Sequence, residues 1–195
     1  FERGGLKRFH IVLAFPTFRD VEKFENIFKD IANFDNIARP NIRIAPKKFL
    51  EVVRDVNPEI PIILAHIFTP YYGALGSSNA FRSISEIFET DFVDNIFIET
   101  GLSADPRIVY SVGELRKYPV ISSSDSHSLS YIGREAVAVK FSRSFKELFE
   151  NLKDKESTFT IENFPQLGKY YLDGHKKCRF KTDNFSVSVC PICGK

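Results

Sequence analysis

Short apolar runs alternate with helix-patterned segments along most of this chain, to about residue 155. Runs at residues 9–15, 61–65, 95–98, 120–122 and 136–141 predict strands, because each is short and mostly apolar. The run at 61–65 is apolar throughout, which is typical of a strand buried on both faces. The alternation predicts an α/β architecture with a mainly parallel sheet or barrel.

Helix signals lie between these runs. Residues 19–34 carry apolar side chains at helical spacing, and Pro46 can occupy the first turn of a helix over residues 46–56. Three further helix starts follow from local chemistry, namely the capping-box patterns Ser83-x-x-Glu86 and Ser144-x-x-Glu147, and the dipeptide Asp105-Pro106.

Length and composition limit the class of protein. A chain of 195 residues can form one domain with a small appendage, and 43% hydrophobic and 27% charged residues are ordinary for a globular protein. No apolar run approaches the roughly 18 residues that span a membrane, and no secretory signal is present, so we expect a cytoplasmic protein without a membrane partner. The absence of Met indicates a fragment of a longer protein, or a processed chain.

The clearest local motif is His175-x2-Cys178-x11-Cys190-x2-Cys193. Two chelating pairs, each with a two-residue interval, are typical of a structural zinc site with four protein ligands. Three cysteines are an odd number, which disfavours a disulfide framework, while chance clustering of cysteines is the alternative. We therefore predict a small zinc-ribbon-like module over residues 166–195, C-terminally truncated, after a larger domain over residues 1–165.

Four potential metal ligands follow successive predicted strands. They are His66, Glu99, Asp125 and His127. An acid or imidazole at the end of each strand is what a barrel-type metalloenzyme would show, although each residue taken alone could cap a turn or be a hydrogen-bonded core residue. His10 falls within the first predicted strand, where it shares a face with Val12 and Ala14.

The loop after His66 contains Phe68, Tyr71 and Tyr72. Aromatic side chains beside a metal site can stack on a base or a sugar, and ordinary loop packing is the alternative.

Several motifs together resemble the endonuclease Q family of the PHP (polymerase and histidinol phosphatase) superfamily. They are AHIFTPYYG at 65–73, IETGLSADP at 98–106, SDSH at 124–127 with IGRE at 132–135, and GKYYLDGH at 168–175. The resemblance implies a distorted (β/α)7 barrel with a multinuclear metal centre, followed by a zinc module. The superfamily's opening H-x-H motif is not in this sequence, so the expected barrel is partial and N-terminally truncated, and the family's C-terminal helical region is also expected to be missing.

The resemblance also implies a function and a set of ligands. Family members cleave DNA on the 5′ side of deaminated bases such as uracil, hypoxanthine and xanthine, and at abasic sites. The implied ligands of the barrel metals (zinc, manganese or magnesium) are His10, His66, Glu99, Asp125 and His127, and those of the structural zinc are His175, Cys178, Cys190 and Cys193.

We therefore expect a metal-dependent DNA-repair endonuclease, with the activity of this fragment left open. The expected catalytic residues are Asp125, His127 and Glu99, with Asp125 also able to orient the attacking water. Phe68, Tyr71 and Tyr72 would contact a flipped base, and Arg134 would pair with a phosphate or with an acid such as Glu135. The alternatives are a PHP-type small-molecule phosphoesterase and a non-catalytic, zinc-stabilised DNA-binding piece.

Overall fold

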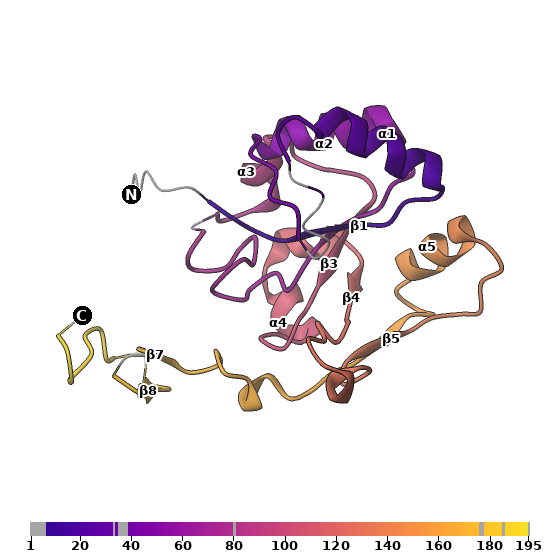
Figure 1. Ribbon diagram of the computed structural model, residues 1–195. Helices are drawn as coiled ribbons and strands as arrows, with labels where there is room; N and C mark the ends of the chain where they lie inside the picture. The colour runs from indigo at the N-terminus through magenta and orange to yellow at the C-terminus, as the bar shows by residue number, and fades with distance from the viewer. Residues whose placement is uncertain are drawn as a thin grey trace.

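A four-stranded sheet forms the centre of the molecule (Figure 1). The computed structural model describes residues 7–32, 34, 39–79, 81–175, 178–184 and 186–194, without the side chains of Asp173 and His175. The strands, in spatial order, are β1 (Ile11–Leu13), β2 (Ile62–Leu64), β3 (Ile96–Glu99) and β4 (Val120–Ile121). β2, β3 and β4 run parallel, whereas β1 is antiparallel to β2. The predicted α/β architecture with a parallel sheet is confirmed.

The sheet is covered on both faces, as its apolar strands predicted. Ile96 and Ile98 belong to the main hydrophobic core, while Phe97 between them belongs to a second core on the opposite face. All four residues of β3 are buried. This two-sided burial explains why the strand reads as a continuous apolar run.

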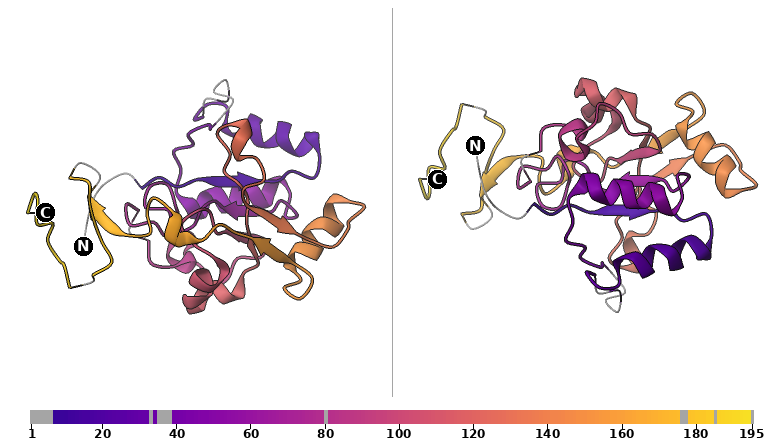
Figure 2. Two further views of the ribbon diagram at one scale, coloured as in Figure 1. Left: turned by 90° about the horizontal axis from the view of Figure 1, so that it is seen from below. Right: turned by 90° about the horizontal axis from the view of Figure 1, so that it is seen from above.

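Three helices cover one face of the sheet. They are α1 (Phe18–Phe28), α2 (Pro46–Val56) and α3 (Ile84–Phe88), which lie together at the top of Figure 1 and in front of the sheet when seen from above in Figure 2. Their apolar sides supply much of the main core, including Phe24, Phe28, Phe49, Val53 and Phe88.

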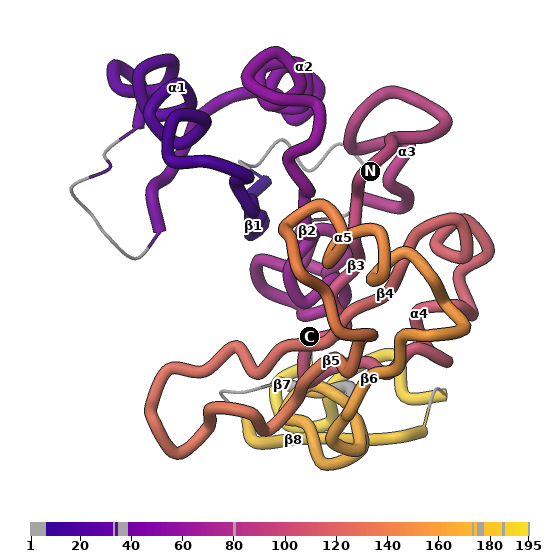
Figure 3. Tube along the Cα trace, turned by 90° about the vertical axis from the view of Figure 1, so that its right-hand side faces the viewer, coloured from indigo at the N-terminus to yellow at the C-terminus, as the bar shows by residue number. Residues whose placement is uncertain are grey.

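The second core lies under α5 (Phe145–Lys153). Leu152 is buried there with Phe97 and Ile121, and the ring of Phe149 lies 5.4 Å from that of Phe97. Figure 3 shows α5 beside the central strands. The remaining helix, α4 (Pro106–Ser111), and the 3-10 turns η1 (Gly113–Lys117), η2 (Leu129–Tyr131) and η3 (Pro165–Leu167) connect the elements.

The helix starts predicted from capping chemistry are confirmed. The Ser83 hydroxyl accepts a hydrogen bond from the backbone N–H of Glu86 at 2.9 Å, and Ser144 does the same for Glu147 at 3.2 Å. Asp105 caps α4, with Pro106 in its first turn. Several elements are shorter than predicted. α1 ends at Phe28, the first strand covers only residues 11–13, and the strand predicted over residues 136–141 ends at Ala138.

Backbone hydrogen bonds account for two of these differences. The Phe28 carbonyl accepts from both Ile31, three residues on, and Ala32, four residues on, which is the shared bonding typical of a helix end. At the first strand, the backbone N–H of His10 donates to the carbonyl of Tyr72 in a loop. Loop contacts of this kind are long-range and leave no local sequence pattern.

The C-terminal part contains two small antiparallel sheets of two strands each. β5 (Ala136–Ala138) pairs antiparallel with β6 (Phe159–Ile161), and β7 (Asp173–His175) pairs antiparallel with β8 (Phe180–Thr182). The pairings among the described strands give an open central sheet, so closure into a barrel stays a prediction, as do the domain boundary at 165 and the ribbon-like character of the module. Within the described part of the chain, no helix is long and apolar enough to cross a membrane.

The central strand should carry much of the stability. We expect Ile98→Ala to lower the free energy of unfolding by about 2–5 kcal/mol, because its side chain is 0% exposed and its removal leaves a cavity. Ile27→Ala on α1 is the matched control, since Ile27 is 51% exposed and should change stability by about 0.5 kcal/mol or less. Urea denaturation followed by circular dichroism measures both, and equal losses would contradict the placement of the core.

Candidate metal sites and nucleic-acid contacts

The predicted barrel ligands meet at one edge of the sheet. Because β2, β3 and β4 are parallel, their C-terminal ends open at the same edge, where ligands commonly bind in α/β folds. His66 lies two residues after β2, Glu99 is the last residue of β3, and Asp125 lies in the turn after β4. His66 and Glu99 are 8% and 6% exposed, so this edge buries an imidazole beside a carboxyl group.

The Glu99 carboxylate is held by groups from both neighbouring strands. Its Oε2 accepts a hydrogen bond from the backbone N–H of His66 at 2.8 Å, and its Oε1 accepts one from the hydroxyl of Ser123. Burial raises the pKa of Glu99 to about 7, and the nearby charge of Asp125 adds to this rise. The carboxyl group is therefore fixed in position and close to its protonation midpoint at neutral pH.

His10 and His66 form a pair next to Glu99. Nδ1 of His10 lies 3.1 Å from Nε2 of His66, and the Tyr72 ring stacks on His10 with centroids 4.8 Å apart. Burial lowers the pKa of both histidines, and each also experiences the opposing charges of Asp125 and Arg39. Both rings are thus biased towards the neutral form, which is the form that binds metals.

The Asp125–His127 turn is more exposed. His127 Nδ1 lies 2.8 Å from the Asp125 carbonyl oxygen and 3.9 Å from its carboxylate Oδ1. The guanidinium of Arg134 donates to the carbonyl of Ser124 at 2.8 Å and to that of Asp125 at 3.4 Å. Asp125 has φ +41°, in the sparsely populated left-handed region, so Arg134 holds a turn that the backbone alone disfavours.

This donor set fits a divalent metal. Nδ1 of His66 is buried without a hydrogen-bond partner, and imidazole and carboxylate groups suit zinc or manganese. Nevertheless, the described residues bring three ligand atoms within 4.8 Å of one another only at the cysteines. The five barrel ligands are gathered at one edge in pairs, and their role stays a prediction.

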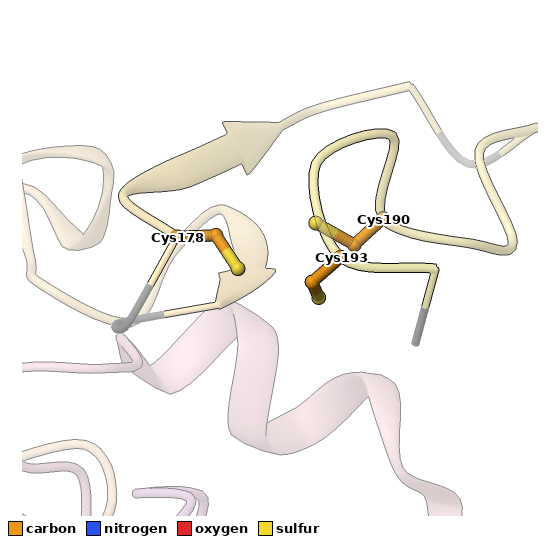
Figure 4. Close-up of side chains that lie close together, drawn as sticks. All are labelled: Cys178, Cys190 and Cys193. Carbon is orange, nitrogen blue, oxygen red and sulfur yellow. The ribbon is translucent and has the colours of Figure 1, made fainter.

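The cysteine site is more compact (Figure 4). The Sγ atoms of Cys178, Cys190 and Cys193 all lie within 4.8 Å of one another. Cys178 comes from the β7–β8 turn and the other two from the loop after β8, where the backbone N–H of Gly194 closes a turn onto the Cys190 carbonyl at 2.9 Å. The predicted fourth ligand, His175, has its side chain outside the described residues.

Hydrogen bonding shifts the pKa values of two of the thiols in opposite directions. The contact with Cys193 raises the pKa of Cys178 to about 11. Burial alone would raise the pKa of Cys190, but the backbone N–H groups of Ile192 and Cys193 outweigh it and lower that pKa. A lowered pKa at Cys190 eases formation of the thiolate that zinc requires, and the three sulfur atoms could hold a metal ion.

The aromatic loop divides into two parts. Phe68 is partly buried against the main core, whereas Tyr71 and Tyr72 are 58% and 46% exposed. Tyr71 meets Tyr170 of the C-terminal part edge-on, with centroids 6.1 Å apart, and Lys169 Nζ lies 5.2 Å from the Tyr170 centroid. Phe68 is thus a packing residue, while the tyrosines are available to a ligand.

Two residues near these sites were missed from the sequence. Arg39 acts electrostatically on His10 and His66, yet it lies in a turn-rich segment without a motif. Tyr170 could have been found, because it belongs to the same GKYYLDGH stretch that supplied His175.

Comparison with solved structures finds matches that cover most of this chain. The lesion-specific endonuclease PfuEndoQ from Pyrococcus furiosus superposes on 96% of this chain with a TM-score of 0.78 and 27% sequence identity. A structure of endonuclease Q in complex with a 27-mer duplex substrate, with an abasic lesion at the active site, gives the same coverage and TM-score at 28% identity. The chain is similar to endonuclease Q.

Sequence comparison gives two relatives without an assigned function. The uncharacterized protein YqxK of Bacillus subtilis is 29% identical over 195 residues, covering 95% of this chain and 48% of its own length. The uncharacterized protein MJ0043 of Methanocaldococcus jannaschii is 32% identical over 143 residues, which are 67% of this chain and 18% of its own length. No family model matches the chain. The chain spans 48% of the length of both endonuclease Q structures.

The close approach of Gly101 to His66 gives a direct test of the barrel edge. A Cβ at Gly101 would lie 2.5 Å from the Cβ of His66, and Gly101 has φ +63°. We expect Gly101→Ala to displace His66 and to lower the free energy of unfolding by about 1–3 kcal/mol. Gly113→Ala is the control, since no atom lies within 4 Å of its added Cβ. With only four histidines, the imidazole NMR signals report the displacement, and unchanged signals would contradict it.

Zinc content tests the cysteine site. We expect Cys190→Ser to lose one zinc per chain, because a structural zinc contributes about 10–16 kcal/mol of binding free energy through thiolate ligands. Ser188→Ala in the same loop is the control and should retain the metal. Elemental analysis of both variants and the wild type is the measurement. Retention of zinc by Cys190→Ser would rule out these sulfur atoms as its ligands.

Proposed function

We propose that this chain forms the metal-binding core of a DNA-repair endonuclease that cleaves on the 5′ side of deaminated bases (uracil, hypoxanthine or xanthine) or at abasic sites. The observation that carries the proposal is the buried His66–Glu99 pair at the C-terminal edge of the sheet, beside His10 and within the field of Asp125. The likeness to lesion-specific endonuclease Q over 96% of the chain supports it.

The five edge residues have distinct parts in this proposal. His10, His66, Glu99, Asp125 and His127 would hold the metal ions, which are zinc, manganese or magnesium. Bound there, such ions lower the pKa of a water molecule and offset negative charge on the scissile phosphate. Because Glu99 has a pKa of about 7, metal binding at neutral pH would release a proton from the fraction of molecules in which Glu99 is still protonated.

The Asp125–His127 turn faces the substrate side in this proposal. The Asp125 side chain is 49% exposed, so its carboxylate can accept a hydrogen bond from the attacking water. His127 Nδ1 lies within hydrogen-bonding distance of the Asp125 carbonyl oxygen, an acceptor only, so Nδ1 carries the proton. Nε2 of His127 is then left with its lone pair, free to act as a ligand or a base. Arg134 contributes by holding this turn through the Ser124 carbonyl.

Tyr71 and Tyr72 would contact the lesion. A base turned out of the duplex needs an exposed aromatic face on which to stack. Both rings are about half exposed, and Tyr72 stacks on His10. Phe68 supports their loop from the core side. Selection for a deaminated base would then require hydrogen bonds to its altered exocyclic position, in addition to stacking.

A second function is favoured by one observation. Only the cysteines bring three ligand atoms together among the described residues. That geometry suits a zinc-stabilised DNA-binding piece without catalytic activity.

Nicking of a uracil-containing duplex in the presence of manganese separates the two functions. We expect Asp125→Ala to lower the nicking rate by more than about 100-fold, because loss of an outer-shell partner alone costs about 10–100-fold. Asp91→Ala, which removes an exposed acid away from the site, should nick like the wild type. Equal nicking by Asp125→Ala and the wild type, or faster turnover of a chromogenic phosphomonoester than of the duplex, would overturn the proposed function.

A further inference from the structure

Glu162, at the end of the β5–β6 pair, hydrogen-bonds to two residues at the edge of the central sheet. It follows directly after β6, and its Oε2 accepts hydrogen bonds from the Thr100 hydroxyl at 3.3 Å and the Ser122 hydroxyl at 3.1 Å. Thr100 and Ser122 are 0% and 1% exposed, and they follow β3 and β4 respectively. A single carboxylate oxygen therefore joins the ends of two neighbouring parallel strands.

The two hydroxyl donors lie next to the residues of the candidate metal site. Thr100 follows Glu99, and Ser122 precedes Ser123, whose hydroxyl donates to Glu99. The backbone N–H of Thr100 donates to the Ile121 carbonyl at 3.1 Å, as part of the β3–β4 ladder. Beyond that backbone hydrogen bond, Glu162 adds a further connection between the segment that follows β3 and the segment that follows β4.

The β5–β6 pair also holds the Asp125 turn, through a second set of hydrogen bonds. Arg134, just before β5, donates to the carbonyls of Ser124 and Asp125. Asn163 ties the two sets together, because its side-chain amide donates to the Arg134 carbonyl at 3.1 Å and its backbone N–H donates to Glu135 Oε1 at 3.3 Å. Residues at this end of the β5–β6 pair thus hydrogen-bond to the segment after β4 at two successive places, Ser122 and the Ser124–Asp125 backbone.

We propose that Glu162 is a positioning residue, which fixes the spacing between Glu99 and the Asp125 turn by joining Thr100 to Ser122. This inference rests on the proposed function only in taking that edge as a metal site. Among the described residues, Glu162 makes no hydrogen bond to the five predicted ligands, and its charge is a minor contributor to the raised pKa of Glu99. It acts through the two hydroxyl groups.

The surroundings of Glu162 predict which replacements are tolerated. Its Oε1 is buried without a hydrogen-bond partner, and burial raises the pKa of the group. Glutamine keeps an acceptor oxygen for the two hydroxyls and resembles the neutral carboxyl form. Alanine leaves the Ser122 hydroxyl without this acceptor and leaves the Thr100 hydroxyl only the Ile121 carbonyl at 3.5 Å, which favours movement of both strand ends.

Manganese titration of the zinc-loaded protein tests this role without relying on nicking. We expect Glu162→Ala to bind Mn²⁺ about 10–100-fold more weakly than the wild type, and Glu162→Gln to stay within about threefold. Zinc at the cysteines should be unchanged in both. Glu156→Ala, which removes an exposed acid on the loop before β6, is the control and should bind normally. If Glu162→Ala does not fold, Ser122→Ala and Thr100→Val each remove one of the two bonds and should weaken binding in the same direction.

Hydrogen exchange of residues 121–127 provides a second readout. We expect at least tenfold faster exchange in Glu162→Ala than in Glu162→Gln when Mn²⁺ is absent, because the strand end is no longer tied. Lower thermal stability of Glu162→Ala with unchanged Mn²⁺ affinity and unchanged exchange would show a merely structural role and overturn the proposal. If the wild type binds Mn²⁺ but does not nick, the proposed function fails while this comparison is unaffected; if it binds no Mn²⁺ at this edge, hydrogen exchange alone decides.

Discussion

The parallel pairing of β2, β3 and β4 is the constraint on which the rest of the structure depends. Parallel neighbours send all their C-terminal ends to the same edge, so residues more than 30 positions apart in sequence, such as His66 and Glu99, meet there. The hydrophobic burial that holds the strands together is supplied by Ile96 and Ile98 on one face and Phe97 on the other. The polar groups at the edge are therefore held in position by an apolar core to which they do not belong.

That edge carries an energetic cost. A buried carboxyl group such as Glu99 resists ionisation, and its pKa of about 7 expresses this. Hydrogen bonds from the His66 backbone N–H and the Ser123 hydroxyl offset part of this cost. Burial also lowers the pKa of the two neighbouring histidines. Buried ionisable groups with shifted pKa values are common at functional sites. A cation bound there would stabilise the carboxylate charge that the folded protein alone compensates only in part.

The cysteine cluster, a candidate metal site, is assembled differently from the ligands at the sheet edge. Its three cysteines come from segments that are close in sequence, and a short hairpin brings them together. Small hairpins of this size bury little apolar surface, so a metal is a common source of their stability. The contact between Tyr71 and Tyr170 links this module to the loop beside His10.

The sequence by itself determined the α/β class, the capped helices and the cysteine cluster, because these depend on residues within a few positions of each other, such as Ser83 with Glu86 or Cys190 with Cys193. It also indicated that His66, Glu99 and Asp125 end successive strands. Only the tertiary structure decided that β1 runs antiparallel, that Arg134 holds backbone carbonyls, and that Glu162 joins Thr100 to Ser122. Those contacts join segments distant in the chain, and no local pattern encodes a distance between them.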